Sequence, residues 1–549
     1  MRDRHHDLKI EEKVARKDSL CMQFSNAVWK QGIDHYFLEE VPFSARNSPE
    51  YAKKCVDLYQ RVIQHIEERD QYGVMEWGSG IGLAGYFFLE TLAQENPSLY
   101  QKTTLYITEQ YYKAIKTSTG LPMFTKHKSR FKRLVVDATE GAIKKPIVFA
   151  WSSFLIDSLE TTPIEKDENG LWELVVSTHV EKDAYVFDTT TFPPEYHDAE
   201  DIKSRLKGNK HPIGSAMDAK IRTCLEETYT KIPWAGSCSS VVDTAIQRRF
   251  SEVETGVLNL PLGIETHLNQ VLSKLCPGGV YLISDFGTTS SVFEGTDGLR
   301  ASYGVSTFHS VDFKLLSYIA EGMSSESWMT QRDPGGTQEM VIGHQQTLFS
   351  EIREVCHNLF KEVGHEAISD VLDDLQETEV LDKSAVERCM QGLSDASSCD
   401  YYFLKTLGGW CLKHDQDSLA EEVAEKCIKT YQEMAFDGFF LKGWCAQRKG
   451  DHNKALEYFK KAERCCKMHA TLYGSMGLSY CYLGDIDRGV DYIKKSFYWG
   501  RNNNIWDMSK LLIQLKNKGV THPDIQAFSE KLECLKDKAR HDDATFTST

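Results

Sequence analysis

The chain of 549 residues carries 64 Lys and Arg against 80 Asp and Glu, a net charge of −16. Its length exceeds what one hydrophobic core supports, and 41% hydrophobic residues exclude a wholly disordered chain. The acidic balance disfavours a nucleic-acid partner, because phosphate binding relies on Lys and Arg. The sequence has no run of 18 apolar residues, so we expect neither a membrane-spanning segment nor a membrane partner.

The first 18 residues mix both charge signs and lack an apolar core, which argues against a secretory signal; we expect a cytoplasmic location. The 15 Cys include no Cys-x-x-Cys pair. Because zinc sites need four ligands at recurrent spacing, we predict no metal site and interpret the cysteines as reduced, buried side chains.

Residues 1–70 are predicted to form a helical lead-in, with Pro49 directly after Ser48 as a typical helix start. From 72 to 290, short apolar runs alternate with helical stretches, which is typical of an α/β fold with a mainly parallel sheet. The predicted strands are YGVMEW, TLYITE, RLVVDA, IVFAW, LWELVVS and VYLISDF. The polar stretch around 195–240 is predicted to be an insertion or lid.

Only helical periodicity follows residue 345, and it includes an internal repeat. Gly443 matches Gly477 and Gly450 matches Gly484, both at an offset of 34, and Asp451 likewise matches Asp485. Small residues suit the crossing of two helices, and Gly-Asp marks the turn between them. The pattern resembles the tetratricopeptide repeat, which implies a curved array that binds another protein.

These patterns predict five segments. Residues 1–70 lead into an α/β domain at 71–350, a helical linker occupies 351–395, tetratricopeptide-like repeats occupy 396–535, and 536–549 form a disordered tail.

The segment with the clearest chemical signal is EWGSGIG at 76–82, where an apolar strand runs into alternating glycines before a helix. Gly78, Gly80 and Gly82 let the chain turn sharply and let a ligand approach the main chain. Glu76 lies within the end of this strand, Glu109 ends the next strand and Asp137 ends the third. Because these strand ends meet at one edge of a parallel sheet, the six residues are predicted to bind one adenosyl ligand.

Two cofactors fit this pattern. Residues 80–85 match the Gly-x-Gly-x-x-Gly fingerprint of dinucleotide binding, which predicts NAD. Glu76, however, is unfavourable beside a pyrophosphate and suits the positive amine of S-adenosylmethionine. Glu109 would accept hydrogen bonds from ribose hydroxyls, and Asp137 would contact adenine. S-adenosylmethionine is therefore favoured over NAD.

Four segments in order resemble the MidA-type family of S-adenosylmethionine-dependent methyltransferases. They are EWGSGIG (76–82), FLIDSL (154–159) with NGLWELVV (169–176), GGVYLISDFG (278–287) and TFHSVDFKLL (307–316). The resemblance implies a Rossmann-like methyltransferase fold over residues 20–350, S-adenosylmethionine as cofactor and, in some members, methylation of protein arginine. Where the family has Asn-Glu, this chain has Ser153-Phe154 and so lacks a carboxylate suited to a guanidinium.

Four side chains near the ends of later strands are candidates for orienting or deprotonating the methyl acceptor: Asp157, Asp285, His309 and Asp312. A strand-end turn is the competing interpretation for Asp285, and helix capping is that for Asp312. Three functions follow: a methyltransferase acting on a protein recruited by the repeats, a catalytically reduced assembly or scaffold protein that binds the cofactor, and an NAD-dependent oxidoreductase.

Overall fold

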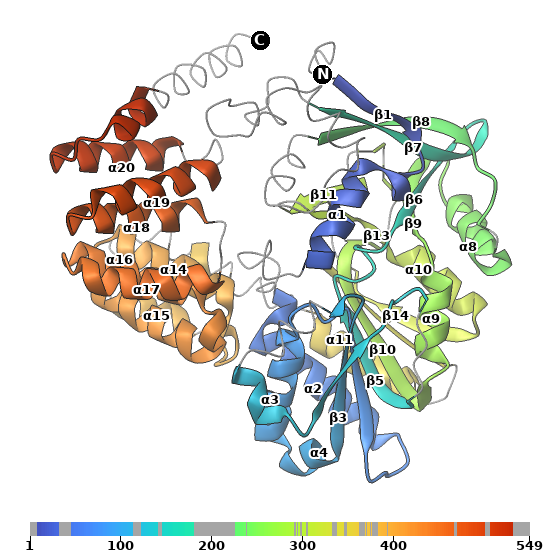
Figure 1. Cartoon of the computed structure of the whole chain (residues 1–549). Coiled ribbons are helices and arrows are strands. Elements are labelled where there is room, and N and C mark those ends of the chain that lie inside the picture. Colours follow the sequence, from blue (N-terminus) through green and yellow to red (C-terminus); the bar gives the residue numbers. More distant parts are fainter. Residues whose placement is uncertain are drawn as a thin grey trace. The chain divides into compact units, whose positions relative to one another are not determined.

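The computed structural model shows two compact units, Met1–Glu366 and Ala367–Thr549 (Figure 1). The structure describes the following residues: 8–31, 45–112, 122–140, 145–180, 225–237, 239–289, 292–293, 295–296, 299–303, 306–331, 337–344, 349–361, 368, 371–373, 375, 383–391, 393–465, 469–499 and 505–530. The predicted tail at 536–549 lies outside them, as do residues 195–224 and 238 of the insertion predicted at 195–240.

The first unit is built on an eight-stranded sheet in which five consecutive strands are parallel. Their order is β4 (Phe131–Val135), β3 (Thr103–Glu109), β2 (Tyr72–Trp77), β5 (Ile147–Ser153) and β10 (Leu275–Thr288). The chain winds from β2 to β3 on one side and returns to β5 on the other. The carboxyl ends of β2 and β5 therefore flank a topological switch point, where open α/β sheets bind ligands.

An antiparallel hairpin completes this sheet. β15 (Thr337–His344) runs antiparallel to β10, β14 (Ser325–Met329) runs antiparallel to β15, and the short β13 (Val311–Asp312) pairs with the end of β10. A dinucleotide-binding sheet continues at this edge with a sixth parallel strand. The predicted α/β class with a mainly parallel sheet is confirmed. Because β15 runs antiparallel to β10, this sheet differs from a dinucleotide-binding sheet.

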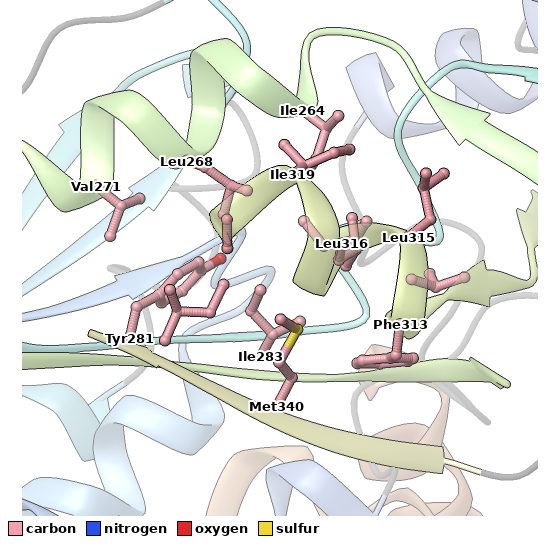
Figure 2. Close-up of a cluster of buried hydrophobic side chains, with 14 of the residues drawn as sticks. Ile264, Leu268, Val271, Tyr281, Ile283, Phe313, Leu315, Leu316, Ile319 and Met340 are labelled. Atoms are coloured by element: carbon pink, nitrogen blue, oxygen red, sulfur yellow. The ribbon is translucent and has the colours of Figure 1, made fainter. Parts of the chain in front are cut away.

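Helices pack on the sheet through apolar faces. α9 (Ile264–Leu272) and α10 (Phe313–Gly322) both contact β10. Figure 2 shows Leu268 of α9 and Ile319 of α10 gathered with Tyr281 of β10 and other buried side chains. Burial of such side chains stabilises the fold by about 1.5–3 kcal/mol each.

A second helical group consists of α2 (Pro49–Gln64), α3 (Leu83–Glu95) and α11 (Phe349–Phe360); α2 contacts both other helices and also β5 and β10. Ser48 caps α2 by accepting a hydrogen bond from the Tyr51 N–H at 3.2 Å. The predicted helix start is thereby confirmed. Because α11 packs on α2, the compact unit continues beyond residue 350 into the segment predicted as a linker.

A second, antiparallel sheet was not predicted. It contains β1 (Leu8–Val14), β7 (Gly170–Val180), β6 (Thr161–Asp167) and β9 (Gly256–Pro261), with β8 (Leu225–Pro233) paired to β7. The predicted helical lead-in is therefore wrong for β1, which pairs with β7 more than 160 residues away. The LWELVVS strand lies in β7 and not in the parallel sheet. Both β1 and β7 form their sheet by pairing with strands distant in sequence, and local periodicity does not reveal such pairing.

The remaining elements of the first unit are short or peripheral. They are η2 (Arg16–Asp18), α1 (Leu20–Gln31), η4 (Ala45–Asn47), α4 (Pro97–Lys102), η5 (Pro122–His127), α8 (Ser240–Ser251), β11 (Arg300–Tyr303) and β12 (Ser306–His309). The predicted insertion at 195–240 contributes β8 within its described part.

In the described residues of the second unit, the labelled elements are all helical. They are α13 (Lys383–Gln391), η9 (Ser397–Cys399), α14 (Tyr401–Lys413), α15 (Asp417–Tyr431), η10 (Gln432–Met434), α16 (Phe436–Arg448), α17 (His452–Cys465), α18 (Ala470–Tyr482), α19 (Ile486–Trp499) and α20 (Ile505–Asn517). Successive helices from α14 to α19 pack on one another. Gly450 and Gly484 adopt φ of +79° and +86° at the turns after α16 and α18.

Ten cysteines whose side chains the structure describes are free thiols, and nine of them are buried. Burial raises the pKa of the Cys411 thiol to about 12. No cluster of three or more His, Cys, Asp or Glu suited to a metal ion occurs in the described part of the chain. None of the helices described there has the length and apolar character needed to cross a bilayer.

The crossing of α18 and α19 yields a matched test. A Cβ at Gly477 would lie 2.7 Å from Ile493 Cγ1 and 2.8 Å from the Gly489 carbonyl oxygen, whereas one at Gly409 would meet nothing within 4 Å. We expect Gly477→Ala to lower the free energy of unfolding by about 1–3 kcal/mol through overpacking. Gly409→Ala should raise it by about 0.5–1 kcal/mol through helix propensity. Urea denaturation followed by circular dichroism measures both; equal stability of the two variants would contradict the close crossing.

Candidate functional site

The glycine turn after β2 depends on backbone conformations that favour glycine. Gly78, Gly80 and Gly82 have φ of +61°, +55° and +76°, and Gly82 is the N-cap of α3. A Cβ on Gly78 would also lie 2.9 Å from Leu155 Cδ1. Side chains at these positions would strain the turn, so the alternating glycines have a direct structural cause.

Hydrogen bonds hold this turn against the end of β3. The Ser79 N–H donates to the Thr108 carbonyl at 2.9 Å, and the Thr108 hydroxyl donates to the Glu76 carbonyl at 3.2 Å. Within the turn, the Gly82 N–H donates to the Ser79 carbonyl at 2.7 Å. The ends of β2 and β3 are therefore fixed relative to each other.

A cavity of about 600 Å³ opens beside this turn, at the carboxyl ends of β2, β3, β4 and β5. Five of the six predicted cofactor residues line it: Glu76, Gly78, Gly80, Glu109 and Asp137. Gly82 does not line the cavity but shapes the turn that does. These residues, predicted from their positions at the strand ends, therefore surround one space.

The cavity is acidic. Its lining includes the carboxyl groups of Glu76, Glu109, Asp137, Glu140 and Glu160, whereas none of the lining residues, all of them in the described ranges, is Lys, Arg or His. Carboxyl groups around a cavity favour cationic ligands, which stabilise their ionised forms, and disfavour phosphates.

Two of these carboxyls have strongly raised pKa values. Burial raises the pKa of Glu76 to about 8, with the Gly85 N–H opposing the shift and the charge of Glu109 adding to it. Burial likewise raises the pKa of Glu109 to about 8, against the Gln110 N–H. Each would be stabilised in its ionised form by a positive charge placed in the cavity.

Asp137 behaves differently. Burial alone would raise its pKa, but the Thr139 N–H and hydroxyl, each donating at 2.7 Å, and the Gln110 amide hold the pKa below its ordinary value. This carboxylate stays ionised near neutral pH and faces the cavity as an acceptor.

Several buried polar atoms at the cavity wall have no hydrogen-bond partner in the described structure. They are Glu76 Oε2, Trp77 Nε1, Ser79 Oγ and Ser153 Oγ. An unsatisfied buried polar group costs about 1–3 kcal/mol. A bound ligand that contacts these atoms would remove that cost.

The segment that follows β5 also lines the cavity and begins with a strained residue. Phe154 has φ of +55°, its N–H donates to the Ser284 carbonyl at 3.0 Å, and its ring stacks on Phe286 with centroids 4.8 Å apart. A non-glycine residue in the left-handed region costs of order 1 kcal/mol and persists only where its surroundings hold it. No local motif in the sequence predicts this conformation.

Asp157 and Asp285 lie together but behind the cavity wall. Both are buried, and Asp285 Oδ2 accepts a hydrogen bond from the Ile156 N–H at 2.9 Å. Burial raises the pKa of each, and the proximity of Asp285 raises that of Asp157 further. The structure joins these two predicted acceptor residues, yet neither lines the cavity.

His309 and Asp312 also stay out of the cavity lining. The backbone N–H of His309 donates to the Asp157 carbonyl at 2.8 Å, and its ring Nε2 lies 3.3 Å from the Met22 sulfur. Asp312 caps α10 through the Leu315 N–H at 2.9 Å and pairs with the buried Arg249 at 2.8 Å. These contacts match the interpretation of Asp312 as a helix cap.

Several cavity residues were not among the predicted site residues, including Ser79, Glu140 and Glu160. Asn26 of α1 also lines the cavity, and its amide donates to Glu160 Oε1 at 3.3 Å. Glu140 and Glu160 follow β4 and β5 closely, so their places near strand ends were a usable signal. The contribution of Asn26 depends on the tertiary fold.

A buried histidine anchors the loop after β4. Burial lowers the pKa of His267 to about 4, so its ring is neutral. Its Nδ1 donates to the Ala138 carbonyl at 3.1 Å, and its Nε2 accepts from the Tyr281 hydroxyl at 2.8 Å. Ala138 lines the cavity beside Asp137, so this contact fixes part of the wall.

No protein-family model and no curated protein matches the chain. Among solved structures, an uncharacterised protein from Burkholderia thailandensis is 14% identical with a TM-score of 0.35, over 70% of this chain and 84% of that chain. Another member of its superfamily from the same organism, bound to S-adenosyl-homocysteine, is 15% identical with a TM-score of 0.33, over 64% and 75%. DhpI in a SAM–HEP complex is 8% identical with a TM-score of 0.28, over 59% and 98%.

The raised pKa of Glu76 predicts a pH-dependent stability. Below its ordinary pKa of 4.5 the carboxyl is protonated in both states. Between 4.5 and about 8 only the unfolded chain loses the proton, so this group makes the fold less stable as pH rises. We expect Glu76→Gln, which cannot ionise, to gain thermal stability over the unchanged chain increasingly from about pH 5 to about pH 8.

Thermal unfolding at several pH values measures this gap. The matched control is Glu168→Gln, which removes an exposed carboxyl group. A gap for Glu76→Gln that does not widen with pH would contradict the buried, protonated carboxyl.

Proposed function

We propose that the first unit is an S-adenosylmethionine-dependent methyltransferase. The observation that carries this proposal is an acidic cavity, without a basic lining residue, beside a glycine turn at the switch point of the sheet. S-adenosylmethionine carries a sulfonium and an ammonium group, whereas NAD carries a pyrophosphate. The charge of the cavity suits the first and opposes the second.

The lining residues divide the ligand between them. Glu76 would face the ammonium group of the methionyl part, Glu109 would accept the ribose hydroxyls, and Asp137 would accept from adenine. Gly78 and Gly80 would let the ligand lie against the main chain. The unpartnered Ser79 Oγ and Trp77 Nε1 offer additional contacts.

A dinucleotide fits this site poorly for a second reason. The pyrophosphate of such ligands sits at the positive N-terminus of the helix after the glycine turn. Here Glu76 Oε2 lies against the first turn of α3, 2.5 Å from where a Cβ on Gly85 would be. A carboxyl group therefore already faces the helix N-terminus, where a phosphate would need to bind.

The cofactor, when bound, supplies a methyl group for in-line displacement by the acceptor. The chain must orient the acceptor and exclude water from it. We assign Asp157 and Asp285 a positioning role: Asp285 holds the Ile156 N–H and thereby the turn that presents Ser153 and Phe154 to the cavity. His309 borders this pair through its bond to the Asp157 carbonyl. For Asp312 we propose a structural role only.

We further propose that the acceptor is a protein recruited by the tetratricopeptide-like helical unit. The matched spacing of its glycines and the successive packing of α14 to α19 support this assignment. Ser153 and Phe154 provide no carboxylate for a guanidinium, so an arginine acceptor is not part of the proposal. The alternative is a cofactor-binding scaffold that has lost transfer, and the same two residues favour it.

Calorimetry on the full chain tests the cofactor. We expect S-adenosylmethionine to bind and NAD to show no heat of binding. Gly80→Val should weaken S-adenosylmethionine by at least about tenfold, because its φ of +55° disfavours valine. Glu109→Gln should weaken it as well, whereas Gly409→Ala should not. Binding of NAD without S-adenosylmethionine would overturn the proposal.

Methyl transfer is tested separately. We expect S-adenosylmethionine with a radiolabelled methyl group to label a protein that the chain captures, and Glu109→Gln to reduce this labelling at limiting cofactor. Mass spectrometry then identifies the methylated residue. Tight cofactor binding with no transfer to any captured protein would favour the scaffold alternative.

A further inference from the structure

A groove of about 500 Å³ lies on the second unit, between one face of α17 and the junction of α18 with α19. Four basic side chains line it: Lys460, Lys461 and Arg464 from α17, and Arg488 from α19. This concentration of basic side chains contrasts with the net charge of −16 of the whole chain.

Two of these cations are neutralised within the groove. Lys461 pairs with Glu457 at 3.0 Å, and Arg488 pairs with Asp485 at 3.5 Å while lying over the Tyr480 ring. Lys460 and Arg464 are exposed, and neither has an ion pair with any residue in the described part of the chain. The groove therefore carries two uncompensated positive charges.

Both neighbouring repeats also have a lysine at the position of Lys460, 34 residues away in sequence. Thirty-four residues after Lys460, Lys494 pairs with Asp524 at 2.7 Å. Thirty-four residues before it, Lys426 donates to the Ser398 hydroxyl at 2.7 Å. The position that would match Asp524 for Lys460 is Val490, which is buried and apolar. Both neighbouring lysines thus have a partner within the chain, and Lys460 lacks the matching one.

We propose that this groove binds an extended acidic segment of a partner protein, whose carboxylates pair with Lys460 and Arg464. The lining of α17 runs from Asn453 to Arg464, about 16 Å, which matches about five residues of extended chain. Leu483, 43% exposed at one side of the groove, offers a contact for one apolar side chain of that segment. This inference rests on the recruiting role proposed for the helical unit and specifies its partner.

Fluorescence anisotropy on the full chain, without cofactor, tests the groove independently of methyl transfer. The probe is a labelled Glu-Asp-Leu-Asp-Glu peptide, and its Gln-Asn-Leu-Asn-Gln counterpart is the uncharged control. We expect only the acidic peptide to bind, and its affinity to fall with added salt. The double variant Lys460→Glu, Arg464→Glu should weaken binding by at least about tenfold.

The matched control is Lys405→Glu, Lys429→Glu, which changes the net charge equally at exposed positions of α14 and α15. It should bind the probe as the unchanged chain does. An equal loss of affinity in both double variants would mean that only net charge matters, which would overturn the proposal. Equal binding of the uncharged peptide would overturn it as well.

Two other occupants are distinguishable. A dimer in sedimentation that Lys460→Glu, Arg464→Glu splits would place a second copy in the groove and overturn the partner proposal. Probe binding only after Asp370, Asp373 and Asp374 are replaced by Asn would place the acidic 366–380 segment of the chain itself there. In each case calorimetry with S-adenosylmethionine is unaffected, so failure here and failure of the proposed function are separate results.

Discussion

The first unit depends on one constraint, the close approach of the Glu76 carboxyl to the first turn of α3. This approach needs glycine at position 85, because any side chain there would collide with the carboxyl. It also buries the carboxyl and raises its pKa to about 8. Burial makes ionisation of the Glu76 carboxyl unfavourable, and a cation beside it would restore the ionised form. This is the behaviour expected of a site that binds a positively charged group.

The walls of the cavity are held by groups that do not enter it. Asp285 fixes the turn after β5, His267 fixes the loop after β4, and Thr108 fixes the glycine turn. Asp285 and Thr108 belong to strands of the parallel sheet, whereas His267 lies on α9 and bonds to Tyr281 of β10. The sheet and a helix packed on it therefore hold the cavity residues in place. The strained backbone of Phe154 is maintained in the same way, through its carbonyl partner on β10 and the Phe286 ring.

The helical unit shows how a repeat varies around a constant frame. Glycines at crossings and turns recur because close helix packing and positive φ require them. The basic positions recur too, but their partners do not: Asp524 serves Lys494, while a buried valine stands where Lys460 would need a carboxylate. The helix pairs are repeated while the partners of their lysines change, and one repeat thereby has a surface that the others lack.

The sequence by itself determined the features that follow from local chemistry. Alternating glycines specified the turn, carboxylates at the ends of β2, β3 and β4 were predicted to converge because parallel strands end at one edge, and the 34-residue offset located the helix pairs. Only the tertiary structure decided the rest. The second sheet arose from pairing of β1 with a strand more than 160 residues away. Burial and capping keep Asp157, Asp285, His309 and Asp312 out of the cavity lining, and the tertiary fold brings Asn26 of α1 to it. Long-range pairing and burial set these positions, and neither leaves a periodic trace in the chain.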